Sequence, residues 1–151
     1  MKDLPLNEIT LRKYEKPENL EERELIRKIC LSLGLLQLAD SRDIIIDILF
    51  VLIKANKNKE ELSSEQIKIK VTELRKKYNL ESKGLTESNI RRQLKRLADF
   101  MLIKKSGNKY FLTEHSSLKE IFEETIEKFI IPRIIKRVKE YLEELDKKEI
   151  L

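Results

Sequence analysis

Residues 86–112 read TESNIRRQLKRLADFMLIKKSGNKYFL and give the clearest indication of the fold. Thr86 is a residue type favoured at the N-cap of a helix. The apolar residues after it recur at the spacing that places them on one helical face, and they are Ile90, Leu94, Leu97 and Met101. Two apolar runs, at 101–103 and 110–112, then flank Gly107 and Asn108, a sequence typical of two strands joined by a tight turn. The stretch therefore predicts a helix that leads directly into a β-hairpin.

The opposite face of this predicted helix is basic and rich in hydrogen-bond donors. The helix residues that we expect to contact nucleic acid are Thr86, Ser88, Asn89, Arg91, Arg92, Lys95 and Arg96. Those of the hairpin are Lys104, Lys105, Asn108 and Lys109. In the major groove of DNA, Arg and Lys can bind guanine edges or phosphates, and Asn can bind adenine. The alternative is that these basic residues only keep a surface helix soluble, with Glu87 and Asp99 pairing with some of them along the helix.

A helix followed at once by a short basic hairpin resembles the winged-helix family of DNA-binding domains, in particular transcription regulators of the archaeal type. The resemblance implies that the helix enters the major groove and that Lys104, Lys105 and Lys109 of the hairpin, or wing, contact the adjacent backbone or minor groove. The sequence departs from the family's usual pattern at two places. The turn at residues 79–85 is longer than usual, and Met101 stands where many members have glycine.

The first 40 residues predict an arm followed by one helix. Residues 1–16 have few regular signals and are expected to be extended. Pro17 suits the first turn of a helix, and Gly34 is a natural stop. The apolar stripe of this helix consists of Leu25, Ile26, Ile29, Cys30 and Leu33. Because the helix is not part of the minimal winged-helix unit, its stripe must pack on that unit or on a second copy of the chain.

Two further helices complete the predicted core over residues 41–113. Ser41 is expected to cap a helix over 42–55, which is apolar nearly all round and should therefore be the central buried helix. Leu62 is expected to form a very short strand. Ser63 and Gln66 match the capping-box pattern at the start of a helix over 64–78.

Residues 114–151 predict a long helical region that begins at a serine cap, Ser116 or Ser117. Pro132 lies inside this region and should kink or divide it near Ile131. Apolar residues beyond the proline repeat at the spacing of a coiled coil, which favours dimerisation through Ile131, Ile134, Ile135, Val138, Tyr141, Leu142 and Leu145. The alternative is that this stripe packs on its own domain.

The charge of the chain is concentrated in the predicted core. Formal net charge is +5, and residues 86–113 alone contain seven basic and two acidic side chains. A nucleic-acid surface should carry such a local excess. Charged residues make up 39% of the chain while Gly and Pro are few, a composition that favours helix and resembles proteins of organisms growing at high temperature.

Groups suited to catalysis or metal binding are scarce. Cys30 is the only cysteine, so it can form neither an intramolecular disulfide nor a thiolate zinc site, and a reducing cytoplasm is expected. His115 is the only histidine and is expected to face solvent in a loop. No signal peptide or membrane-spanning run is evident. We therefore expect no cofactor, no metal, no membrane association and no enzymatic activity.

These observations predict a mainly α protein with a small β-hairpin. Its expected parts are an N-terminal arm and helix (1–40), a winged helix-turn-helix core (41–113) and a C-terminal helical dimerisation segment (114–151). The expected function is sequence-specific binding of double-stranded DNA by a dimeric transcription regulator. The alternative is a winged-helix module that contacts proteins without sequence-specific DNA binding, because a fold alone does not settle function.

Overall fold

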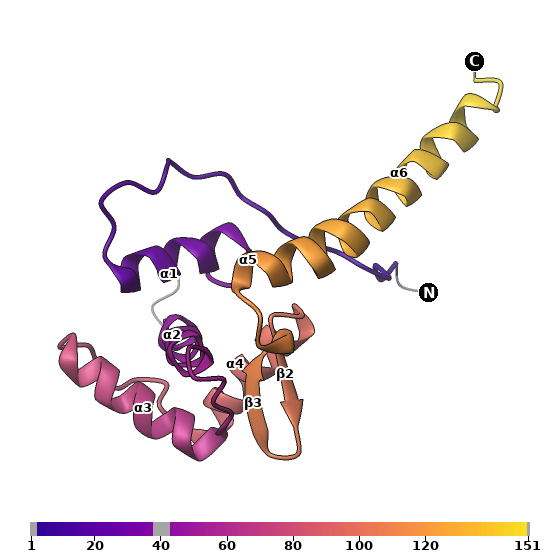
Figure 1. The fold of residues 1–151 in the computed structure, drawn as a ribbon. Helices are drawn as coiled ribbons and strands as arrows, with labels where there is room; N and C mark the ends of the chain where they lie inside the picture. Colours follow the sequence, from indigo (N-terminus) through magenta and orange to yellow (C-terminus); the bar gives the residue numbers. More distant parts are fainter. Residues whose placement is uncertain (1–2, 38–42, 151) are drawn as a thin grey trace.

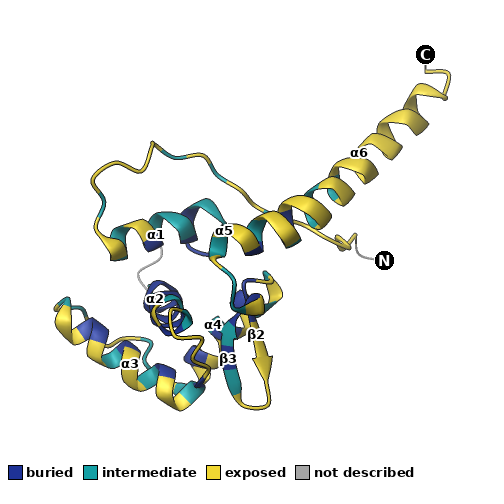
Figure 2. Cartoon of the chain, in the orientation of Figure 1, coloured by how far each residue is buried: buried dark blue, intermediate teal, exposed yellow. Residues whose placement is uncertain are grey.

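Helix α2 (Ile44–Asn56) is the element around which the rest of the core packs, as expected from its apolar sequence. The computed structural model describes residues 3–37 and 43–150 (Figure 1). Every residue from Ile44 to Leu52 is buried, and Figure 2 shows α2 almost entirely in the colour of buried residues. Helices α1 (Glu22–Ser32), α3 (Ser64–Lys77) and α4 (Glu87–Asp99) and strand β3 all contact it. The fold is thus mainly helical, with its hydrophobic core centred on one helix.

A three-stranded antiparallel sheet covers one end of this core. Its strands are β1 (Leu62–Ser63), β2 (Ile103–Ser106) and β3 (Lys109–Leu112), in the order β1-β3-β2. Leu62 lies opposite Tyr110, and Ile103 lies opposite Leu112. The predicted hairpin and the predicted short strand at Leu62 are therefore both confirmed.

The predicted caps of α3 and α4 are also confirmed. At the start of α3, the Ser63 hydroxyl accepts a hydrogen bond from the backbone N–H of Gln66 (3.2 Å), and the Gln66 side chain accepts one from the N–H of Ser63 (2.8 Å). At the start of α4, Thr86 Oγ1 accepts a hydrogen bond from the N–H of Asn89 (3.2 Å). Each cap satisfies backbone donors that a helix start leaves unpaired.

Helix α1 begins at Glu22, so the prediction that it begins at Pro17 is wrong. Asn19 has a φ of 55°, a left-handed conformation that a right-handed helix cannot contain, so the chain enters α1 only after this residue. The apolar residues of α1, which were predicted to form a single stripe, lie on two faces of the helix. Ile26 and Cys30 are buried against the core, whereas Leu25 is 39% exposed.

The start of α2 lies two residues beyond the predicted one. The expected cap, Ser41, and the next residue, Arg42, lie outside the described residues. Asp43 occupies the N-cap position but its side chain does not cap the helix. Its carboxylate instead binds Arg23 and Arg75, as described below.

The C-terminal region is a helix whose hydrogen-bonding pattern changes along its length. It comprises α5 (Leu118–Ile121), a π-helical segment η2 (Phe122–Ile130) and α6 (Ile131–Asp146), after the short turn η1 (Thr113–His115). Of the two candidate caps, Ser117 accepts the hydrogen bond, from the N–H of Glu120 (3.2 Å). The predicted division near Ile131 takes the form of a change from π to α hydrogen bonding, with Pro132 in the first turn of α6, while the ribbon continues in one direction (Figure 1). No residue of α6 is buried (Figure 2).

Candidate nucleic-acid interface

Helix α4 separates an apolar face from a basic face, as its sequence predicts. Ile90, Leu94 and Leu97 are fully buried. The opposite side exposes a hydroxyl and four basic side chains, which are Ser88, Arg91, Arg92, Lys95 and Arg96. Because the buried stripe fixes the rotation of the helix about its axis, these polar side chains must point away from the core.

Asn89 does not belong to this exposed set, and its assignment as a contact residue is a correction. It is buried, and its Nδ2 donates a hydrogen bond to the carbonyl of Gly84 (2.9 Å). Its Oδ1 accepts hydrogen bonds from Arg92 (2.7 Å) and Gln93 (3.2 Å). With both ends of the amide engaged inside the protein, Asn89 positions other groups rather than facing a ligand.

Two of the exposed basic residues have acidic partners one turn away. Arg91 lies 2.9 Å from Glu87, and Lys95 lies 2.9 Å from Asp99. Such exposed pairs contribute about 0–1 kcal/mol, since water screens them. A phosphate group can therefore replace Glu87 or Asp99 as the partner of the basic side chain at a small cost in free energy.

The other two basic residues of α4 differ in how they are held. Arg92 hydrogen-bonds only to the neutral side chain of Asn89 within the described part of the chain. Arg96 donates one hydrogen bond to Gln93 Oε1 (2.8 Å) and another to the carbonyl of Leu35 (2.7 Å), after α1. Arg96 thus ties α4 to the segment that follows α1, whereas the guanidinium of Arg92 keeps its charge uncompensated.

In the hairpin, Lys104 and Lys105 are exposed and Lys109 is partly buried. Lys104 pairs with Glu114, whose pKa is lowered because Lys104 donates a hydrogen bond to it. Lys105 lies over the ring of Tyr110, with its Nζ 5.6 Å from the ring centre. Lys109 Nζ donates a hydrogen bond to Gln66 Oε1 (3.3 Å). Asn108 is exposed at the turn, beside Gly107.

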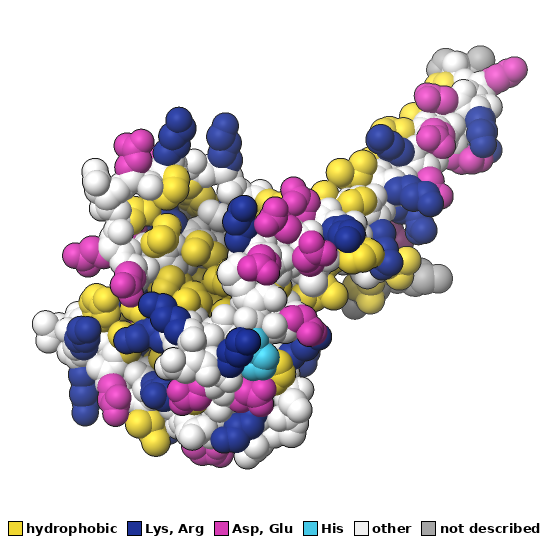
Figure 3. Space-filling view, in the orientation of Figure 1, with side chains coloured by type: hydrophobic (Ala, Val, Ile, Leu, Met, Phe, Trp, Pro, Cys, Tyr) yellow, Lys and Arg dark blue, Asp and Glu magenta, His cyan; other side chains and the backbone are white. Residues whose placement is uncertain are grey.

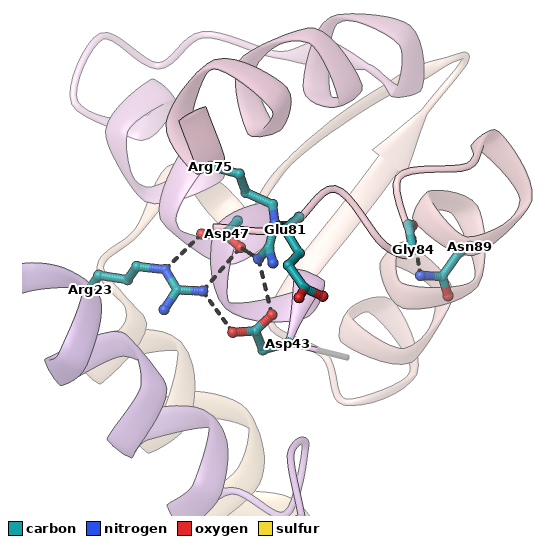
Figure 4. A network of polar contacts seen from close by, with 7 residues as sticks. All are labelled: Arg23, Asp43, Asp47, Arg75, Glu81, Gly84 and Asn89. Carbon is teal, nitrogen blue, oxygen red and sulfur yellow. Dashed lines mark hydrogen bonds and ion pairs between the residues drawn. The ribbon is translucent and has the colours of Figure 1, made fainter. Parts of the chain in front are cut away.

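Two polar contacts fix the turn between α3 and α4, which sets where α4 starts (Figure 4). Arg75 Nε donates a hydrogen bond to the carbonyl of Glu81 (2.6 Å), and Asn89 holds the carbonyl of Gly84. Gly84 has a φ of 88°, and a Cβ there would lie 3.0 Å from Asn89 Nδ2 and 3.1 Å from Ile44 Cγ1. The long turn is therefore anchored at both ends by side chains of the flanking helices.

Arg75 is itself held by a group of buried and partly buried charges that joins α1, α2 and α3 (Figure 4). Asp47 is fully buried and lies 2.6 Å from Arg75 Nη1 and 2.9 Å from Arg23 Nε. Asp43 lies 3.0 Å from both arginines. Burial alone would raise the pKa of Asp43, but its hydrogen bonds and attraction to Arg23 and Arg75 outweigh burial and lower that pKa. The same carboxylates raise the pKa of Arg23 despite its burial.

The junction between α4 and β2 contains a strained residue. Met101 has a φ of 70°, in the left-handed region that favours glycine. Its N–H donates to the carbonyl of Ala98 (2.9 Å), and its carbonyl accepts from Thr113 Oγ1 (2.8 Å). These contacts hold the backbone in a conformation that a side chain at this position disfavours. Met101 is consequently exposed and does not extend the buried stripe of α4.

The His115 side chain is 26% exposed, so the prediction that it faces solvent in a loop is met only in part. The ring is partly buried and stacks on Phe111, with ring centres 4.7 Å apart. Its Nε2 lies 3.1 Å from Glu61 Oε2, which joins the end of the hairpin to the segment before β1. The position indicates a structural contact.

Sequence reasoning missed the buried charges, although one signal was present. Asp47 interrupts a helix that is otherwise apolar nearly all round, and a charge in such a place requires a buried partner of opposite sign. The sequence contains many arginines, so the pattern does not identify Arg23 and Arg75 as these partners. No signal distinguished Asn89 from the exposed residues beside it.

No family model matches this chain, and neither curated protein sequences nor solved structures gave a match. Within residues 3–37 and 43–150, no helix is long and apolar enough to cross a membrane, and no group of three or more His, Cys, Asp or Glu side chains could hold a metal ion.

Proposed function

We propose that residues 41–113 form a winged-helix domain that binds double-stranded DNA, with α4 in the major groove and the β2–β3 hairpin as the wing. The observation that carries this proposal is the basic face of α4, with Arg91, Arg92 and Lys95 directly opposite three fully buried apolar residues. The exposed lysines of the hairpin follow this helix in the chain. Both elements carry cationic side chains of the kind that bind phosphates and guanine edges.

The uncompensated charge supports nucleic acid as the ligand. Of the seven basic residues in 86–113, three have acidic partners, while within the described part of the chain four contact only neutral groups. These four are Arg92, Arg96, Lys105 and Lys109. An excess of cations that the chain does not neutralise favours an anionic ligand.

A protein-contact module is the second candidate, and α4 argues against it. None of the large apolar side chains exposed in the described residues lies within α4. A helix used for protein contact is expected to present such side chains at the centre of the interface. Five of the exposed large apolar side chains lie on α6, which we propose as the segment that makes the protein a dimeric regulator.

The test is DNA affinity of α4 variants, measured by fluorescence anisotropy with a pool of random duplexes and then with sequences enriched from it. Arg92→Ala is expected to weaken binding by about 1–3 kcal/mol if this side chain reaches a base edge. Lys95→Ala is expected to reduce affinity about equally for all sequences and to flatten the dependence on salt, because lysine contacts phosphate as a point charge.

Arg27→Ala is the matched control, since Arg27 lies on the surface of α1 and, like Arg91, pairs with a glutamate of its own helix. Circular dichroism establishes that each variant is folded. If Arg92→Ala and Lys95→Ala together leave affinity unchanged, α4 is not the DNA-reading helix.

A further inference from the structure

An apolar groove of about 700 Å³ lies on the side of the molecule formed by α1, α5 and the N-terminal arm. The second face of α1 forms one wall, through Leu25, Ile29 and Leu33. Leu118 and Phe122 form the other wall, from α5 and η2. Figure 3 shows hydrophobic side chains gathered between α1 and α5 on this face. The arm, over residues 14–20, borders the groove.

A second apolar surface lies on α6, which projects away from the core (Figure 1). Its five exposed large apolar residues are Ile135, Val138, Tyr141, Leu142 and Leu145, each about half exposed or more. They fall on one side of the helix because of their spacing. The helix continues α5 and η2 without reversal, so α6 cannot fold back onto the groove of its own chain.

The areas of these two surfaces indicate that they are used together. The five side chains of α6 present on the order of 500 Å², if a large side chain has roughly 200 Å² of surface. A stable interface of standard size buries about 800 Å² on each partner. Pairing of α6 with α6 alone falls short of this area, whereas adding the apolar walls of the groove approaches it.

We propose that two chains exchange their C-terminal helices, so that α6 of each chain lies in the α1–α5 groove of the other. The inference rests on the dimer that forms part of the proposed function and specifies its interface. A two-fold arrangement makes every contact twice, so one exchange covers the stripe and the groove of both chains. It also assigns a partner to the outer face of α1, which the described residues cover only in part.

Cross-linking of single-cysteine variants tests the arrangement. The native cysteine is suitable as a silent background, because Cys30 is buried and burial raises the pKa of its thiol to about 12. Leu25→Cys places a thiol in the groove, and Leu142→Cys places one on α6, at positions 39% and 55% exposed. The two proteins are mixed, allowed to exchange chains, and treated with a short bismaleimide in the absence of DNA.

Exchange of helices predicts a cross-linked dimer in the mixture, up to about half of the chains, because random exchange gives that share of mixed dimers. Neither variant should cross-link strongly alone. Ile69→Cys, on α3 and 59% exposed, is the control partner for Leu142→Cys and should give no product. Light scattering of the unmodified protein should give the mass of two chains.

Efficient cross-linking of Leu142→Cys with itself, without a product from the mixture, would show α6 packed on α6 and overturn the proposal. A monomeric mass at micromolar concentration would also overturn it. Neither outcome depends on nucleic acid, so DNA binding and helix exchange can fail separately.

Discussion

Helices α4 and α6 have the same kind of sequence and opposite environments. Both carry apolar residues along one side and charged residues along the other. In α4 the large apolar residues are fully buried in the core that this helix forms with α2, α3 and β2, whereas in α6 every large apolar residue beyond Ile134 is about half exposed or more. An amphipathic pattern therefore predicts that one face of a helix packs against another element. It does not predict whether that element belongs to the same chain.

The largest expected difference between the two helices is the cost of removing a leucine. Leu94→Ala in α4 should lower the free energy of unfolding by about 2–5 kcal/mol, because it leaves a cavity in a closed core. Leu142→Ala in α6 should change it by less than about 0.5 kcal/mol at nanomolar protein, where chains are separate, and more at high concentration. Urea unfolding at two protein concentrations measures the free energy of unfolding of both variants. Equal costs at all concentrations would mean that α6 is covered by its own chain.

A second contrast concerns charge, between the buried group around Asp47 and the exposed pairs of α4. Arg75→Met should cost about 3–5 kcal/mol, because it leaves the fully buried Asp47 with one partner and also releases the turn at Glu81. Lys95→Met, which removes the exposed pair with Asp99, should cost less than about 1 kcal/mol. Thermal unfolding by circular dichroism gives the comparison.

Hydrogen exchange sharpens that comparison by locating the effect. In Arg75→Met, exchange should quicken over residues 79–86, the turn that Arg75 and Asn89 anchor. Exchange in α6 should remain as in the unchanged protein. Uniform quickening along the chain would instead indicate general destabilisation, without a specific role for Arg75 in placing α4.

The smallest expected contrast is between two substitutions of Met101 at the end of α4, one of which should stabilise the protein. Met101→Gly should raise the free energy of unfolding by about 0.5–1 kcal/mol, since a left-handed L residue costs about 1–2 kcal/mol and the freedom of glycine in the unfolded chain offsets part of the gain. Met101→Ala retains the Cβ and should give no increase. A decrease for the glycine variant would show that the Met101 side chain stabilises the junction.

The fold was predictable from sequence wherever the signal was local. The capping box at Ser63 and the cap at Thr86 are decided by residues within one helical turn, and the hairpin around Gly107 by a few residues. The start of α1 was missed because Asn19 takes a left-handed conformation that its residue type permits but does not require. Patterns of neighbouring residues thus predicted which elements form more accurately than they predicted where each element begins and ends.

The candidate site was predictable in composition but less so in geometry. The basic face of α4 follows from periodicity, whereas the burial of Asn89 depends on a turn that folds back over the start of the helix. The anchoring of Arg96 depends on Leu35, a residue far away in sequence. Such contacts require the tertiary arrangement, which no pattern within α4 contains.

The length of the π-helical segment η2 determines the direction in which the apolar side of α6 faces relative to the core. Each residue of an α-helix turns the chain by about 100°, so inserting or deleting one residue between Phe122 and Ile130 would swing the apolar side of α6 through that angle without altering a residue of α6. The sequence of α6 therefore determines which residues form its apolar side, whereas η2 determines the direction in which that side faces. In the proposed dimer, a change in the length of η2 would therefore turn the apolar side of α6 away from the groove of the partner chain.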